Sequence, residues 1–190
     1  MNVVLPTPMT VDEFLRWSAR QERGRYELEG GRVIEMPGES GGHVRVKHLV
    51  RDALAAAVAS AGLPLYCWQN GLSVRIEPGR TFEPDAFVAP LPYPDDEALE
   101  VENPVIVVEV LSPSTMQRDL TTKVAGYALV ATIEHYIVID RWEWSVLHFR
   151  RSGQVLLPPL DPLRPGANLR LDPPGLVVPV AELTGPVPTG

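Results

Sequence analysis

Two carboxylates occur in segments whose other residues predict buried β-strands. Residues 105–111 are β-branched or aliphatic except for Glu109, and Asp85, after Pro84, interrupts the neighbouring predicted strand in the same way. A buried charge costs several kcal/mol unless a partner compensates it. Two carboxylates on adjacent strands also repel each other, so a divalent cation is a simple way to keep both ionised. Hydrogen bonds to main-chain amides, or a pairing with arginine, would be a purely structural alternative.

The helix predicted after the Glu109 strand brings a lysine toward these acids. Asp119, Lys123 and Tyr127 are spaced four residues apart, so they project from one helical face. Leu120, Val124 and Tyr127 mark the buried stripe, which places Lys123 on or beside the inward face. The alternative is a surface ion pair between Lys123 and Asp119, worth about 0.3–0.5 kcal/mol.

A third acid lies in a predicted β-hairpin. Residues 25–29 and 32–36 alternate between apolar and polar on either side of a Gly-Gly pair, which is typical of a hairpin turn. Glu27 shares one strand face with Arg25 and Glu29. That face is either a solvated strand surface or the place of a third carboxylate near a metal site.

The longest predicted helix, residues 43–61, begins with a histidine. Apolar residues repeat along it at helical spacing. His43 lies three residues before Val46 and extends the inward stripe to the helix start, either as a satisfied core residue or as part of a site. The basic residues of this helix indicate an ordinary solvated face; they are Arg45, Lys47 and Arg51.

Helices and strands that alternate along the chain must position these residues. Thr10-Val-Asp-Glu13 is a capping box that predicts a short first helix. Strands are predicted over residues 65–76 and 82–89, on either side of a turn at 77–80. The remaining strands and a final helical turn are predicted at residues 135–140, 145–150, 155–157, 169–171, 176–178 and 179–183.

The length and composition suit one globular domain. With 190 residues, of which 45% are hydrophobic, we expect a single domain over residues 1–190. Its core would span about residues 10–151, with a Pro-rich β extension, 152–190, packed on it. The net charge of −7 argues against binding of nucleic acid by bulk electrostatics, but it does not exclude a nuclease.

Cysteine content and hydropathy bear on the compartment. One cysteine excludes an internal disulfide framework, and one cysteine with four histidines excludes a zinc finger or ribbon. No signal peptide and no run of about 18 apolar residues is present, so we expect a cytoplasmic protein without a membrane span. No glycine-rich phosphate loop occurs, and no organic cofactor is expected.

Residues spread over almost the whole chain match one family. They are Tyr26, Glu27, Leu28, Gly31, His43, Pro84, Asp85, the phrase Val-Glu-Val-Leu-Ser-Pro-Ser-Thr at 108–115, Asp119, Lys123 and Tyr127. With these residues the sequence resembles the PD-(D/E)XK nuclease superfamily, and within it the Uma-type "putative restriction endonucleases", long catalogued as a domain of unknown function. The resemblance implies an α/β (α+β) fold: a mixed central β-sheet flanked by helices, with an N-terminal hairpin and an irregular β C-terminal extension.

The sequence departs from the superfamily motif at one position. Leu111 stands two residues after Glu109, where the standard motif has lysine. The resemblance implies that the lysine has moved to the following helix, with Lys123 as the candidate. The chemistry needs an ammonium within reach of the attacking water or scissile phosphate, and a helix packed on the Glu109 strand can supply one.

The first hypothesis is metal-dependent hydrolysis of phosphodiester bonds in DNA. Asp85, Glu109 and the main-chain carbonyl of Val110 would hold Mg²⁺, with Mn²⁺ as a substitute, because hard cations prefer oxygen ligands. Lys123 would orient or help deprotonate a bound water. The residues expected to support this catalytic group are Glu27, His43, Asp119 and Tyr127.

Two other functions are compatible with parts of the sequence. A nuclease fold retained as a nucleic-acid-binding or assembly module would keep the acids for structure, and the acidic charge and lack of a recognisable DNA-reading element favour it. A glycosidase could use Asp85 and Glu109 as its carboxylate pair, but it would give Lys123 no part.

The expected oligomeric state follows from the expected substrate. Cleavage of both strands of a duplex needs two active sites or a reorientation step, and two-fold symmetry commonly supplies two sites. Exposed aromatic groups often mark an interface. We therefore expect a homodimer built partly from the region after Asp140, where Trp142, Trp144 and residues 156–158 are candidates.

Overall fold

The computed structural model describes residues 8–187 and is organised around a six-stranded sheet in the order β10-β9-β8-β7-β6-β3. β7 and β8 run parallel, and every other neighbouring pair in this sheet is antiparallel. The predicted mixed central sheet is confirmed. Its strands are β3 (Leu65–Trp68), β6 (Ala86–Pro90), β7 (Ile106–Val110), β8 (His135–Asp140), β9 (Ser145–Ser152) and β10 (Val155–Leu157).

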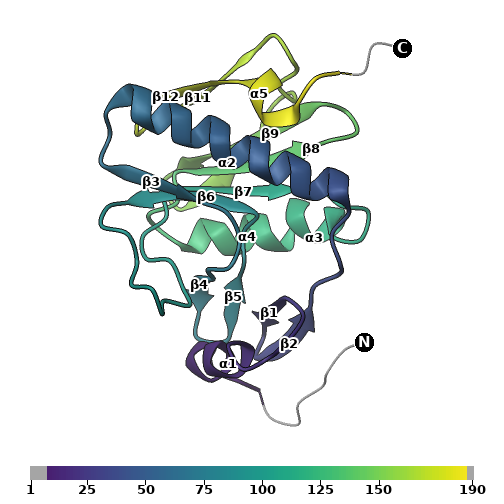
Figure 1. Ribbon diagram of the computed structural model, residues 1–190, viewed down its shortest axis with the longest axis vertical. Coiled ribbons are helices and arrows are strands. Elements are labelled where there is room, and N and C mark those ends of the chain that lie inside the picture. The colour runs from purple at the N-terminus through teal and green to yellow at the C-terminus, as the bar shows by residue number, and fades with distance from the viewer. Residues whose placement is uncertain (1–7, 188–190) are drawn as a thin grey trace.

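Helices cover both faces of this sheet (Figure 1). α2 (Gly41–Ala61) lies on one face, and α3 (Met116–Leu120) and α4 (Thr122–Leu129) lie on the other. Because side chains alternate along a strand, β7 contributes Val108 to the core with α2 and Val107 to the core with α4. Every residue of β7 is buried, which accounts for the apolar residues on both sides of Glu109.

The long helix begins at Gly41 rather than at His43. The hydroxyl of Ser40 accepts a hydrogen bond from the His43 amide at 3.3 Å and caps the helix. Gly62 ends the helix in the left-handed conformation, with φ of 62°, which glycine adopts without strain. His43 therefore lies in the first turn, where its side chain is buried, as the inward stripe predicts.

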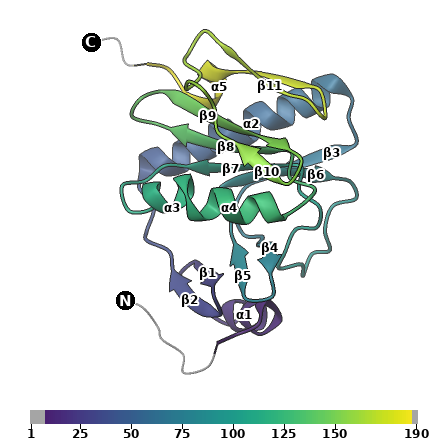
Figure 2. The same ribbon diagram turned by 180° about the vertical axis from the view of Figure 1, so that it is seen from behind.

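A four-stranded sheet and a short helix form an N-terminal lobe, drawn at the lower end of Figures 1 and 2. The strand order is β2-β1-β5-β4, and Phe14 and Leu28 belong to a separate small core. The predicted capping box is confirmed by bonds between Thr10 and Glu13. The elements are α1 (Val11–Ser18), β1 (Tyr26–Glu29), β2 (Arg32–Glu35), β4 (Val74–Glu77) and β5 (Arg80–Phe82).

Two predicted strands are wrong because each joins parts of two sheets. The segment 65–76 divides into β3 and β4 at a turn where Asn70 has φ of 51°. The segment 82–89 divides into β5 and β6 around Pro84, which has no amide to donate. The chain thus crosses from the central sheet to the lobe and back, and Asp85 lies at the return crossing.

The C-terminal extension packs against α2. β11 (Asn168–Leu171) and β12 (Leu176–Pro179) pair antiparallel, and α5 (Val180–Thr184) follows them. Leu169 and Val178 share the core of α2. The predicted short strands and final helical turn are confirmed, and β10 is part of the central sheet. None of the described helices has the length and apolar character needed to cross a membrane.

Candidate active site

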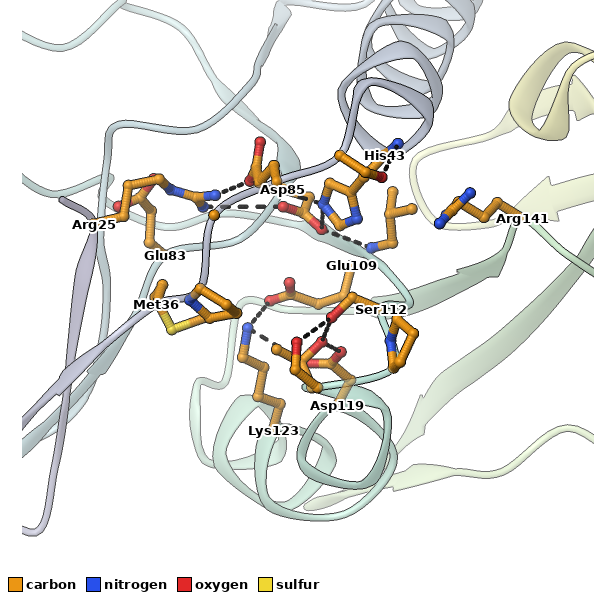
Figure 3. A pocket seen from close by; sticks show the side chains of 18 residues that line it. Arg25, Met36, His43, Glu83, Asp85, Glu109, Ser112, Asp119, Lys123 and Arg141 are labelled. Atoms are coloured by element: carbon orange, nitrogen blue, oxygen red, sulfur yellow. Dashed lines mark hydrogen bonds and ion pairs between the residues drawn. The ribbon is translucent and has the colours of Figure 1, made fainter. Parts of the chain in front are cut away.

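A cavity of about 300 Å³ lies between the lobe, the start of α2, the end of β7 and the α3–α4 pair (Figure 3). The predicted site residues that line it are His43, Asp85, Glu109, Val110, Asp119 and Lys123. Glu27 and Tyr127 are fully buried next to it, because Glu27 contacts Lys123 and Tyr127 contacts Glu109. The structure therefore brings all eight predicted residues to one place.

The pairing of β6 with β7 brings the two central acids together. The antiparallel register places Ala86 opposite Val108, and Asp85 and Glu109 are the next residues along the two chains. The amide of Val110 donates a hydrogen bond to Asp85 Oδ2 at 2.7 Å. Glu109 lies in β7, and Asp85 directly precedes the neighbouring strand β6, so the two acids are close as the sequence predicts.

Donors from α2 and β7 hold the Asp85 carboxylate. His43 Nε2 lies 3.3 Å from Asp85 Oδ2, and Lys47 Nζ lies 3.4 Å from Oδ1. Burial by itself raises the pKa of Asp85. The hydrogen bond and charge of His43, the charge of Lys47 and the Val110 amide outweigh burial and lower this pKa to about 2. Asp85 therefore remains ionised and can serve as a cation ligand.

Glu109 receives two donors from α4 on a single oxygen. Lys123 Nζ lies 2.7 Å from Glu109 Oε1, and the Tyr127 hydroxyl lies 2.9 Å from the same atom. Alternation along β7 turns Glu109 to the face that α4 covers, and one helical turn separates Lys123 from Tyr127. An ammonium thus reaches Glu109 from the following helix, although Leu111 occupies the motif position.

Lys123 contacts three carboxylates in total. Its Nζ lies 3.1 Å from Glu27 Oε1 and 3.6 Å from Asp119 Oδ1, in addition to Glu109. Burial by itself lowers the pKa of Lys123, but the three carboxylates outweigh burial and raise it. Lys123 is therefore a charged ammonium. The surface-pair alternative for Lys123 is wrong, since its side chain is 1% exposed.

Asp119 and Lys123 do not share one helix. A break at Thr121, with φ of −131°, separates α3 from α4, so this part of the prediction is wrong. The two side chains still meet because the chain resumes helical geometry directly after the break. The Thr115 hydroxyl donates to Asp119 Oδ2 at 2.7 Å and fixes the carboxylate next to the cavity.

Of the two alternatives for Glu27, the solvated strand face is wrong. The Glu27 side chain has no exposed surface and pairs with Arg118 as well as Lys123. It also accepts the amide of Glu83 at 3.0 Å. Arg118 in turn binds Glu29 at 3.1 Å, so it ties β1 of the lobe to α3.

Sequence reasoning missed six charged residues of the site: Arg25, Glu39, Lys47, Glu83, Arg118 and Arg141. Lys47 is the clearest correction, because the expected solvated residue is fully buried and lies 2.5 Å from Glu39. Its spacing of four residues after the inward His43 was the available signal. Arg25 reaches Glu83 at 2.9 Å across the lobe, a contact between residues too far apart for any sequence pattern.

The ion pairs around the cavity leave an excess of negative charge. Seven carboxylates meet four permanent cations. Burial raises the pKa of Glu109 well above its usual range; Lys123 opposes the shift, and neighbouring carboxylates add to it. A divalent cation would offset this excess, and carboxylate oxygens are the ligands that Mg²⁺ prefers. The donor set therefore fits the expected metal.

One group of side chains in the described part of the chain has the spacing of metal ligands. Ligand atoms of Glu39, His43 and Asp85 all lie within 4.8 Å of one another. Glu109 and Val110, which the sequence pairs with Asp85 as ligands, line the same cavity. Asp85 belongs to both ligand sets.

Comparisons with known proteins agree with this fold. A family model described as "Uma2: Putative restriction endonuclease" matches residues 11–181. The uncharacterized protein sll1609 of Synechocystis sp. is 27% identical over 156 residues, which cover 80% of this chain and 87% of that protein. A second uncharacterized protein of this organism, slr1290, is 26% identical over 167 residues, which cover 78% and 84% of the two chains.

A solved structure shares the architecture. It is described as a putative nuclease belonging to DUF820 from Anabaena variabilis and matches with a TM-score of 0.68. The match covers 93% of this chain and 98% of that chain at 19% identity. The similarity at this identity shows that the two proteins have the same fold.

Proposed function

Because the chain belongs to the Uma2 family of "putative restriction endonucleases", we propose that it is an endonuclease that hydrolyses phosphodiester bonds in DNA with a divalent metal ion. The observation that supports this most directly is the convergence of Asp85, Glu109 and Lys123 on one cavity. β7 and the residue before β6 supply the acids, and a separate helix supplies the lysine that the motif position lacks.

The three residues have different tasks in this proposal. A water oxygen attacks phosphorus, the bond between phosphorus and one ester oxygen breaks, and the leaving oxygen takes up a proton. Lys123 and Tyr127 occupy Oε1 of Glu109, so Oε2, which has no donor among residues 8–187, is left for a ligand. The raised pKa of Lys123 suits an ammonium that orients water or offsets charge on the phosphate, and it makes Lys123 a poor base.

Mg²⁺ is the expected ion, with Mn²⁺ as a substitute. Asp85, Glu109 and the carbonyl of Val110 would hold it, and His43 and Lys47 keep Asp85 ionised and fixed. When bound, such an ion polarises the phosphate and lowers the pKa of a coordinated water.

Plasmid cleavage tests the activity. With Mg²⁺ or Mn²⁺ we expect the wild type to nick and linearise supercoiled DNA. Asp85→Asn and Glu109→Gln keep the side-chain shape but remove the charge, so each should slow cleavage by about 100-fold or more. Glu182→Gln, which changes an exposed acid on α5, is the matched control and should cut like the wild type. Cleavage that persists in both site variants would refute the assignment.

Titration calorimetry separates this proposal from a silent nuclease-fold module. The wild type should bind Mn²⁺ or Mg²⁺ at millimolar concentration, and Asp85→Asn should bind much more weakly. A protein that binds neither ion, yet binds DNA, would instead be the nucleic-acid-binding module.

We further propose that the protein acts as a homodimer. Two active sites related by two-fold symmetry would allow both strands of a duplex to be cut in one encounter. The surface best suited to the contact is the exposed edge of β10, which lies in the expected region after Asp140.

A further inference from the structure

We propose that Arg141 and Trp142 bind a backbone phosphate of the DNA next to the catalytic cavity. Arg141 would contact the phosphate directly, and Trp142 would position the Arg141 side chain. This inference rests on the proposed nuclease function, since it concerns how the same cavity receives its substrate.

The turn between β8 and β9 fixes both residues. Asp140 Oδ1 accepts hydrogen bonds from the amides of Trp142 at 2.9 Å and Glu143 at 3.0 Å. Arg164 from the C-terminal extension donates to the Glu143 carbonyl at 2.5 Å. The turn is therefore fixed both by its own Asp140 and by Arg164 of the extension. This favours a defined direction for the Arg141 and Trp142 side chains.

Arg141 extends from this turn to the cavity, which it lines (Figure 3). Its Nη1 lies 3.0 Å from the position that a Cβ atom on Gly42 would occupy. The guanidinium thus packs directly against the first turn of α2, and the missing side chain at Gly42 permits this approach. His43, a contact of Asp85, is the next residue, so Arg141 stands beside the proposed metal ligands.

Arg141 differs from the other cations that line the cavity. Arg25 is bound by Glu83 and Glu39, and Lys123 is bound by three carboxylates. Within residues 8–187, the Arg141 guanidinium has no carboxylate partner, and its Nε is buried without a hydrogen-bond partner. An excess of acids at the rest of the cavity would repel DNA, so an uncommitted cation is the group that can attract it.

The Trp142 ring packs against this guanidinium. The Arg141 Cζ lies 3.9 Å from the centre of the Trp142 ring, which is the geometry of a cation–π contact. The indole is 37% exposed, so it stiffens a side chain that would otherwise be mobile at the surface. The planar guanidinium can donate two parallel hydrogen bonds to a phosphate, and on the DNA backbone the phosphate is the anion available to it.

Binding to a labelled DNA duplex tests this inference without relying on cleavage. Fluorescence anisotropy is measured in Ca²⁺, and a gel confirms that the duplex remains intact. We expect Arg141→Ala to weaken binding at least tenfold and to reduce the slope of log K against log salt by about 0.9, the contribution of one phosphate contact. Arg141→Lys should give an intermediate affinity with nearly the full slope, because it keeps the charge but loses the fork.

Further variants separate this contact from a general loss of positive charge and from a loss of folding. Arg170→Ala removes an exposed arginine from β11 and should change affinity less than twofold. Trp142→Ala should weaken binding, whereas Trp142→Phe should restore most of it, because a ring still supports the guanidinium. Circular dichroism and thermal melting of each variant should match the wild type.

The outcomes distinguish the inference from the proposed function. An Arg141→Ala protein with wild-type affinity and salt slope would overturn the inference, and so would a wild type that does not bind DNA. If the wild type binds DNA through Arg141 but never cleaves it with Mg²⁺ or Mn²⁺, the phosphate contact stands and the nuclease function fails. If the wild type cleaves DNA and Arg141→Ala binds DNA with wild-type affinity and salt slope, only the inference fails.

Discussion

Lys123 allows three buried acids to coexist. Glu27, Glu109 and Asp119 are each at most 3% exposed, and the Lys123 ammonium is the cation that all three contact. Ion pairs of this kind are costly to form, because both charges lose their hydration. Removal of only one partner is also costly, because it leaves the other charge buried without compensation.

Lys123→Met removes the charge and keeps most of the bulk. It leaves the three carboxylates without their shared partner, so we expect the free energy of unfolding to fall by about 3–5 kcal/mol. Urea unfolding monitored by circular dichroism measures this loss. Adding Glu109→Gln to Lys123→Met removes one of the unpaired charges and should recover part of the stability. If the free energy of unfolding of Lys123→Met alone lies within about 0.5 kcal/mol of the wild-type value, the three acids are not ionised together.

The sequence predicts the acids of the cavity better than the basic residues that pair with them. Glu109 is conspicuous because it interrupts a strand that is otherwise apolar, and the family resemblance supplies a place for Lys123. Lys47 has only its spacing after His43 as a signal, and Arg25 has none, since their partners Asp85 and Glu83 are distant in the sequence.

Among the elements, β8 and β9 are joined to the C-terminal extension by a pair of histidines. His135 Nε2 lies 2.6 Å from the carbonyl of Pro173 and His135 Nδ1 lies 2.9 Å from His148 Nε2. A carbonyl only accepts, so His135 donates through Nε2 and accepts at Nδ1 from His148. This arrangement is satisfied with both rings neutral, whereas protonation of both rings would direct two N–H groups at each other.

This pair should make stability depend on pH. Burial lowers the pKa of His135, and burial with the neighbouring charge of His135 lowers that of His148 to about 3. A depressed pKa contributes stability that is complete above the unfolded value of about 6.5 and is lost as the pH falls toward the folded value. The urea midpoint should therefore decrease between about pH 7 and pH 5.

His148→Gln isolates this effect, since its amide can still donate to His135 but does not titrate in this range. We expect a smaller decrease of the urea midpoint from about pH 7 to pH 5 than in the wild type. His48→Gln, which changes an exposed histidine of α2, should retain the full wild-type decrease. Equal pH dependence in all three proteins would contradict a titrating pair.

The element boundaries show where local patterns stop being informative. The capping box at Thr10 and the hairpin of β1 and β2 are local signals, and both are confirmed. The segments 65–76 and 82–89 are each predicted as one strand because apolar residues occur at both ends of each segment. Asn70-Gly71 and Pro84 mark the breaks locally, but which sheet each part joins is set by long-range pairing.

For the molecule as a whole, the central sheet ends in an unpaired strand. β10 pairs with β9 on one side and has no strand on the other within the described chain. Val155 and Leu157 on this strand are 52% and 50% exposed, and nearby Leu160 is fully exposed. An exposed apolar edge of this kind is a ready template for pairing with a second chain. The Trp142 ring instead packs against Arg141, which lines the cavity.

We expect two copies to associate through the β10 edge, which would give the duplex two active sites. Light scattering at micromolar concentration should then give a mass near twice the 20.9 kDa of one chain. Leu157→Lys combined with Leu160→Lys places charges in the apolar contact and should shift the mass to that of one chain. Val177→Lys, an equally exposed apolar position on β12, should leave the dimer intact. A wild type that scatters as a single chain would defeat the dimer and leave the metal site unaffected, because every residue of the cavity comes from one copy.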